Sequence, residues 1–186
     1  MTKKLNLLIL TILFTGVMLF SAKAYAGGTD FNSYYVGING GFLQTAPSGV
    51  SSKSGGTYNL SLGKDFNINN AVLGGGVMLG YADNGSFGGG VSLNSVYYGA
   101  FAKGGYDINN FMPFVKLGYI GTSFNGSNGA GNSTESGLLY GAGVEYMINA
   151  VWGVTAQYLG SSLSGGSNGY PNIRVNNYTI GVDFNF

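Results

Sequence analysis

The sequence predicts an all-β fold: an eight-stranded antiparallel, up-and-down transmembrane β-barrel that follows a cleaved signal peptide. Two observations carry this prediction. Apolar and polar residues alternate through much of the chain after residue 30, and short turns recur every 40 residues. Composition agrees, because only 8% of the 186 residues are charged while 15% are aromatic and 35 are glycine. A chain this rich in aromatic residues buries apolar surface, either in its own core or in lipid.

Residues 1–26 are typical of an export signal. Two lysines precede an apolar run over residues 5–20, and an Ala-Tyr-Ala pattern ends at Ala26. The apolar run is shorter than the roughly 20 residues that a transmembrane helix needs, and a small-x-small pattern is what signal peptidase accepts. We therefore expect Sec-dependent export, cleavage after Ala26, and a single barrel domain over residues 27–186.

Alternation with period two is clearest over residues 138–146 and 178–186. In the latter segment, Tyr178, Ile180 and Val182 share one face while Thr179 and Gly181 lie on the other. Successive side chains of a strand point to opposite sides, so each such segment has one apolar and one polar face. Eight segments of this kind are expected, at residues 34–43, 57–66, 71–82, 94–107, 111–123, 137–148, 151–160 and 174–186.

The connections between these segments alternate in length. Ile68, Ile108 and Ile148 lie 40 residues apart, within or immediately before three short turns at residues 67–70, 108–110 and 149–150. Four longer connections rich in Gly, Ser, Asn and Thr cover residues 44–56, 83–93, 124–136 and 161–173. A propeller blade of similar length would hold four strands, whereas each unit here holds two. Short turns at one end, which we expect to face the periplasm, and long loops at the other are typical of outer-membrane barrels.

The position of the charged residues distinguishes a lipid-facing barrel from a soluble one. On the apolar face we find only Lys64, near a turn where its stem can snorkel. A soluble, lipocalin-like barrel would have to fit its many tyrosines into an interior that is narrow for eight strands. The apolar face is therefore expected to meet lipid. The polar face is expected to hold a lumen charge cluster of Asp65, Lys103, Asp107, Lys116, Glu145 and Asp183.

Buried charges need partners, so we expect Lys103 and Lys116 to pair with acids of this cluster. Two interpretations of such pairing stay open. The first is a plug that fills and specifies the barrel, and the second is a charge constriction that opens when partners exchange.

The residue inventory excludes much chemistry. The chain contains no His and no Cys, and its formal charge is only +1. It therefore offers no imidazole base, no thiol nucleophile and no usual zinc site, and nothing in it indicates a cofactor or a nucleic-acid partner. A G-x-S-x-G pattern at residues 165–169 lacks both a following helix and a histidine, and the glycine runs 74–76 and 88–90 lack the lysine of a phosphate-binding loop.

Three segments resemble the small outer-membrane β-barrel proteins (OmpA-like/opacity-type) of Gram-negative bacteria: residues 34–42, 113–119 and 141–146. The chain end also resembles their C-terminal assembly signal, whose positions are held here by Thr179, Gly181, Phe184 and Phe186. The resemblance implies location in the outer membrane among lipid and lipopolysaccharide. It also implies insertion by periplasmic chaperones and the barrel assembly machinery.

These observations favour a structural or surface-interaction barrel without catalytic activity. Such a barrel would display four polar loops, with host or phage contacts as the kind of interaction they offer. The alternative is a weak porin or narrow gated channel for small solutes, since eight strands leave at most a narrow path. A channel for apolar solutes would need an apolar lumen, which the inward Gly, Asn, Lys and Asp are not expected to provide.

Overall fold

The computed structural model describes residues 31–47, 52–87, 91–126, 133–164 and 173–186. The expected signal peptide, the glycine run 88–90 and the pattern at 165–169 lie outside these residues. Eight strands form: β1 (Tyr34–Pro47), β2 (Lys53–Ile68), β3 (Ala71–Phe87), β4 (Val91–Tyr106), β5 (Phe111–Gly126), β6 (Ser133–Met147), β7 (Trp152–Ser164) and β8 (Ile173–Asn185).

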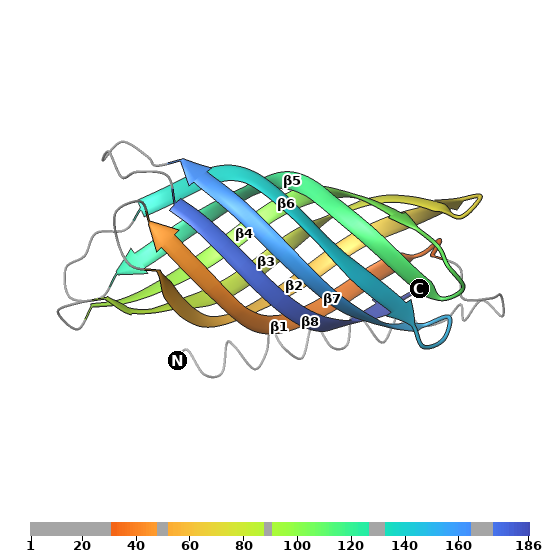
Figure 1. Ribbon diagram of the computed structural model, residues 1–186, viewed down its shortest axis with the longest axis horizontal. Coiled ribbons are helices and arrows are strands. Elements are labelled where there is room, and N and C mark those ends of the chain that lie inside the picture. Colours follow the sequence, from red (N-terminus) through yellow and green to blue (C-terminus); the bar gives the residue numbers. More distant parts are fainter. Residues whose placement is uncertain (1–30, 48–51, 88–90, 127–132, 165–172) are drawn as a thin grey trace, which may run out of the picture.

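The strands close into a barrel in chain order, each antiparallel to its neighbours, which confirms the predicted fold class. Closure is made by β1 and β8, whose pairing runs from Tyr35 opposite Asn185 to Pro47 opposite Ile173. These two strands lie side by side in Figure 1, in orange and dark blue. In the part of the chain that the structure describes, no helix is long and apolar enough to cross a membrane.

The strands extend further toward the long-loop end than the sequence indicated. β1 continues to Pro47 rather than residue 43, and β3 continues to Phe87 rather than residue 82. The expected loops at 44–56, 83–93, 124–136 and 161–173 are therefore partly strand. Their Gly, Ser, Asn and Thr residues resemble loop residues by composition, but they pair across the sheet, as Thr45 does with Lys53, with one shift of register between Asp83 and Ser86 of β3.

The apolar face points outward, as predicted. Ile38, Leu117, Leu138 and Ile180 are 66–68% exposed, whereas the residues beside them along the strands face the interior. Lipid can solvate such a surface, and alternation of lipid-facing and lumen-facing side chains is the pattern of membrane barrels.

Aromatic side chains border this apolar band at both ends. The outer girdle, toward the long loops, consists of Phe42, Tyr58, Tyr81, Tyr98, Tyr119, Tyr140, Tyr158 and Tyr178. The inner girdle, toward the short turns, consists of Tyr34, Phe66, Tyr106, Phe111, Tyr146, Trp152 and Phe186. Beyond the outer girdle the outward side chains become polar, and we call these positions the outer rim: Gln44, Asp83, Asn94, Ser123, Thr134, Ser162, Arg174 and Asn176. Such girdles mark the two membrane–water interfaces.

Two of the short turns have the same geometry. Asn69 and Asn70 both adopt positive φ, at 51° and 73°, and Asn109 and Asn110 do so at 49° and 72°. Two consecutive left-handed residues give the type I′ turn that matches the twist of a hairpin, and Asn tolerates that conformation better than most residues. In the third turn, the side chain of Asn149 instead accepts hydrogen bonds from the backbone of Val151 and Trp152, both at 2.9 Å.

We expect Asn109→Val to lower the free energy of unfolding by about 1–2 kcal/mol, because a β-branched residue is strained at positive φ. Asn109→Gly should be close to neutral. Asn125, an exposed strand residue of β5 without positive φ, provides the control Asn125→Val, which should change stability little. Equilibrium urea unfolding in lipid vesicles measures all three, and equal effects of the two valine variants would contradict the turn assignment.

Candidate functional site: the barrel interior

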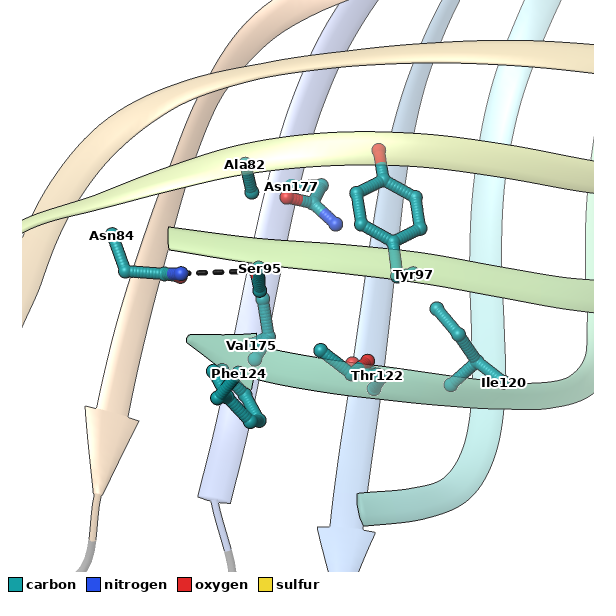
Figure 2. Close-up of a pocket in the computed structure, with 10 residues that line it drawn as sticks. Ala82, Asn84, Ser95, Tyr97, Ile120, Thr122, Phe124, Val175 and Asn177 are labelled. Atoms are coloured by element: carbon teal, nitrogen blue, oxygen red, sulfur yellow. Dashed lines mark hydrogen bonds between the residues drawn. The ribbon is translucent and has the colours of Figure 1, made fainter. Parts of the chain in front are cut away.

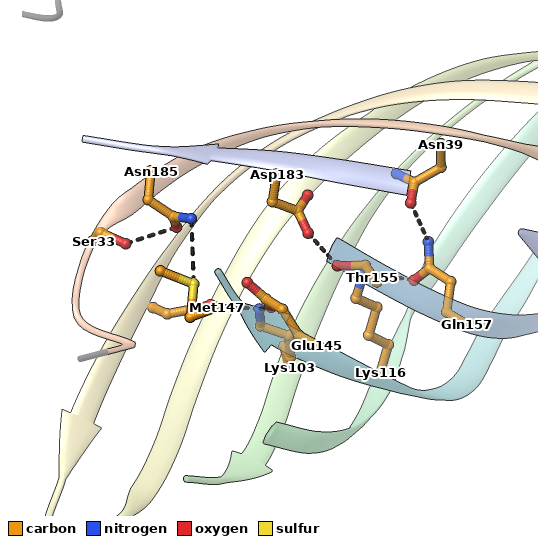
Figure 3. A network of polar contacts seen from close by, with 11 residues as sticks. Ser33, Asn39, Lys103, Lys116, Glu145, Met147, Thr155, Gln157, Asp183 and Asn185 are labelled. Carbon is orange, nitrogen blue, oxygen red and sulfur yellow. Dashed lines mark hydrogen bonds and ion pairs between the residues drawn. The ribbon is translucent and has the colours of Figure 1, made fainter. Parts of the chain in front are cut away.

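Lys103 joins three strands across the interior. Its ammonium forms ion pairs with Asp65 on β2 and with Glu145 on β6, the latter at 3.2 Å between Nζ and Oε2. β4 is adjacent to neither of those strands, so the contacts cross the lumen (Figure 3). The three residues are at most 4% exposed. Two carboxylates around one buried ammonium give each charge a partner, which an isolated buried charge would lack.

Lys116 differs from the expectation, because its partner is an amide rather than an acid. Its Nζ donates to Oε1 of Gln157 at 2.9 Å, and Gln157 in turn donates to Asn39 at 3.3 Å (Figure 3). Among the described residues, no carboxylate lies within ion-pair distance of this lysine. Lys116 stands directly opposite Lys103 in the β4–β5 register, and Lys103 already engages two carboxylates.

Aromatic rings complete the surroundings of both lysines. The Nζ of Lys103 lies 4.6 Å from the ring centroid of Tyr35, and that of Lys116 lies 4.5 Å from the ring centroid of Phe101. Phe114 faces both ammonium groups, at 5.5 Å and 5.1 Å. These distances fall within the range of cation–π attraction, so the rings stabilise the two neighbouring cations where water is scarce.

The two remaining acids of the predicted cluster are placed differently from each other. Asp183 is 5% exposed inside the barrel and accepts a hydrogen bond from the hydroxyl of Thr155. Asp107 lies beyond the end of β4, where it accepts from Nδ2 of Asn67 at 3.1 Å. The structure therefore brings Asp65, Lys103, Glu145, Asp183 and Lys116 into the interior, and leaves Asp107 at a turn. The alternation of β4 would place the side chain of Asp107 on the inward face, but β4 ends at Tyr106, one residue before it.

Apolar side chains also line the interior, which the sequence analysis missed. A buried cluster extends from Tyr35 near the inner end to Leu43, Phe124 and Leu163 at the level of the outer rim. The expectation of a lumen without apolar lining is therefore wrong. The signal was present, because each of these residues occupies an inward position of the alternation. A second, smaller cluster closes the inner end and consists of Phe31, Val72, Met112, Phe114 and Met147.

The interior contains a small cavity. One cavity of about 10 Å³ lies toward the outer end, lined among others by Tyr97, Thr122 and Asn177 (Figure 2). A cavity of this size holds about one water molecule. Oδ1 of Asn177 is buried without a hydrogen-bond partner among the described residues, so the site is polar enough for that water. Within the described ranges, no group of three or more acidic, His or Cys side chains could hold a metal ion.

The four residues of the proposed assembly signal lie along β8 with alternating orientation. Thr179 and Gly181 face the interior, and Gly181 packs against the side chain of Asn39. Phe184 and Phe186 face outward, with their ring centroids 6.1 Å apart, and Phe186 also stacks on Tyr34 of β1 at 6.0 Å. The last aromatic residue thus covers the seam at which the barrel closes.

Lys103→Met is expected to lower the free energy of unfolding by about 3–5 kcal/mol, because it leaves two buried carboxylates without their cation. Lys116→Met is the matched variant: it is equally buried but leaves a neutral amide, so we expect a smaller loss of about 1.5–3 kcal/mol. Adding Asp65→Asn to Lys103→Met should recover part of the loss. Urea unfolding measures the set, and strict additivity of the double variant would contradict the pairing.

Comparison with known proteins agrees with this geometry. The family model described as "Outer membrane protein beta-barrel domain" matches residues 12–186. No curated protein sequence matches the chain closely enough to count as a relative.

Several solved barrels share the fold. Neisserial surface protein A (NspA) is 20% identical, with a TM-score of 0.67 over 82% of this chain and 97% of that one. Ail, the attachment invasion locus protein of Yersinia pestis, is 17% identical, with a TM-score of 0.59 over 84% and 100%. The N-terminal barrel domain of Pseudomonas aeruginosa OprF is 17% identical, with a TM-score of 0.51 over 86% and 100%. The chain belongs to the outer-membrane β-barrel domain family and is an outer-membrane protein.

Proposed function

We propose that this protein is a closed barrel that anchors in the outer membrane and presents its outer rim and loops for contact with other molecules, without catalysis. The observation that carries the proposal is the change in outward side chains at the outer girdle. On the membrane side of the girdle they are apolar, as at Ile38 and Ile180, and beyond it they are polar, as at Gln44 and Asn176. The polar positions are the part of the wall that molecules outside the membrane can reach.

The filled interior supports this proposal over the porin alternative. The ion pairs of Lys103 cross the lumen, and buried apolar and polar side chains occupy the half of the barrel beyond them. An eight-stranded barrel is only just wide enough for side chains, so these groups leave little room for a solute. A gated path would require both carboxylates to leave Lys103, and each would then need a new partner in the interior.

Absence of catalysis rests on the residues rather than on the fold. The outer-membrane enzyme PagL shares the architecture, at 19% identity and a TM-score of 0.50, so a barrel of this kind can carry an active site. This sequence contains no His and no Cys, so it lacks the imidazole that most often acts as a general base and activates a serine, and it lacks a thiol nucleophile.

The names of two similar barrels, a surface protein and an attachment and invasion protein, point to contact at the cell surface as the kind of function. Ail has also been solved with the heparin analogue sucrose octasulfate. The described outer rim of this protein carries one outward cation, Arg174, and one outward acid, Asp83. Its contacts with a host or phage surface would therefore depend on neutral hydrogen-bonding groups rather than on a basic patch.

Assembly partners complete the proposal. Phe184 and Phe186 present aromatic rings on the lipid side of the last strand, while Thr179 and Gly181 face inward. This alternation gives the barrel assembly machinery and periplasmic chaperones an exposed apolar edge to recognise before β8 pairs with β1. After insertion, the same face meets outer-membrane lipid and lipopolysaccharide.

In planar bilayers, the refolded protein should show no sustained open level, because the charged and apolar layers block the interior. Lys103→Met, which removes the central cation, should raise the frequency of small conductance events relative to Lys53→Met, a control outside the layer. A sustained porin-sized conductance of the unmodified protein would favour the porin alternative instead.

Epitope tags should report the orientation. A tag near Asn128 or Ser167, both outside the described residues, should be accessible to antibody on intact cells. A tag at Asn109 should become accessible only after the outer membrane is permeabilised, because short turns face the periplasm. Exposure of the Asn109 tag alone on intact cells would show that the barrel is inverted.

A further inference from the structure

Lys64 is the one charged side chain that faces outward between the two girdles in the described part of the barrel. It lies on β2, two residues before the inner-girdle residue Phe66 and directly opposite Tyr34 of β1. A charge at this position faces lipid, where an ammonium is unfavourable unless it reaches the interface or finds an anion. The residues around Lys64 therefore determine how its charge is stabilised at this position.

Two aromatic rings hold the ammonium. Nζ of Lys64 lies 4.1 Å from the ring centroid of Tyr34 and 4.9 Å from that of Phe66. Both rings belong to the inner girdle, so the side chain reaches toward the level of the lipid headgroups. Cation–π contacts restrict the position of the ammonium, but they satisfy none of its three N–H donors with a strong acceptor.

Among the residues that the structure describes, no acidic side chain forms an ion pair with this ammonium. The described acids Asp65, Glu145 and Asp183 are enclosed on the other side of the wall. On β3, the residue opposite Lys64 is Gly75, which places no side chain over the neighbouring surface. The ammonium is thus positioned by its rings and open on its lipid side.

We propose that Lys64, held by Tyr34 and Phe66, is a binding site for the phosphate diester of a glycerophospholipid in the leaflet at the inner girdle. The phosphate is the anion that a membrane offers at headgroup depth, and a charge-assisted hydrogen bond from Nζ would give both groups their partner. The acyl chains of the same lipid would lie along the apolar band. The site goes beyond the proposed surface contacts and does not depend on them.

The test measures the proximity of lysine nitrogen to lipid phosphorus directly. After removal of residues 1–26 the chain keeps four lysines, Lys53, Lys64, Lys103 and Lys116. Protein with ¹⁵N-labelled lysine is folded into bilayers of phosphatidylethanolamine and phosphatidylglycerol, and ¹⁵N–³¹P dipolar dephasing is recorded by solid-state NMR. We expect about one quarter of the lysine Nζ signal, that of Lys64, to be dephased by lipid phosphorus.

Variants show which lysine gives the dephased signal. Lys64→Met should remove the dephasing, and Lys53→Met, the matched variant at the far end of the same strand, should leave it unchanged. If Lys64→Met fails to fold, Lys64→Arg keeps the cation; combined with Arg174→Gln, it leaves position 64 as the one arginine of the chain, and ¹⁵N-arginine labelling should then show a dephased guanidinium. Dephasing that survives Lys64→Met, or that disappears with Lys53→Met, would overturn the proposal.

A second arm separates a lipid from a free anion. The protein is folded into vesicles of a phosphate-free galactolipid, with inorganic phosphate in the buffer. The proposal expects no dephasing there, because the site depends on a phosphate anchored at headgroup depth. Equal dephasing in both bilayers would identify Lys64 as a site for free phosphate and contradict the lipid assignment, while leaving the proposed surface function untouched.

Discussion

The pairing of β1 with β8 is the interaction on which the rest of the structure depends. A hydrocarbon environment offers no partner for backbone amides, so an open sheet edge in the membrane would be strongly unfavourable. Closure removes both edges, and Tyr34 and Phe186 complete it through reciprocal backbone hydrogen bonds of 3.1 Å and 2.9 Å. An even number of strands then brings the first and last strand ends to the same side of the membrane.

Closure with eight strands also limits the volume of side chains that the barrel can hold inside. Large side chains are accommodated there only where the neighbouring inward position is small. A Cβ added at Gly63 would collide with the ring of Tyr35, and one added at Gly80 would collide with that of Tyr97. Inward glycines therefore do more than permit curvature, because they provide the volume that buried tyrosines occupy. The outward face has no such limit on side-chain volume, and the aromatic residues of the two girdles lie on it.

Strand number, connectivity and the orientation of each face could be predicted because they depend on local alternation. The partners of the buried charges could not be predicted in the same way, because the tilt of the strands in the closed barrel brings together residues of non-adjacent strands. Asp65, Lys103 and Glu145 are an example. The same reason explains why the amide partner of Lys116 was missed. The strands were predicted too short at the long-loop end because polar strand residues such as Thr45 and Ser54 cannot be told from loop residues by composition alone.

The outer girdle divides the wall into two parts with opposite outward polarity. Within the membrane band the outside is apolar and the interior holds the charged layer, whereas in the outer rim Ser123 and Ser162 face out beside inward Phe124 and Leu163. Inward Thr45, Asn84 and Ser95 form a hydrogen-bonded chain beside these apolar side chains, so the interior of the rim combines apolar packing with internal polar contacts. The rim thus has packing of its own, which explains why the strands continue beyond the lipid. A binding surface built on this rim would be held by paired strands rather than by the loops alone, and would keep its shape when a partner approaches.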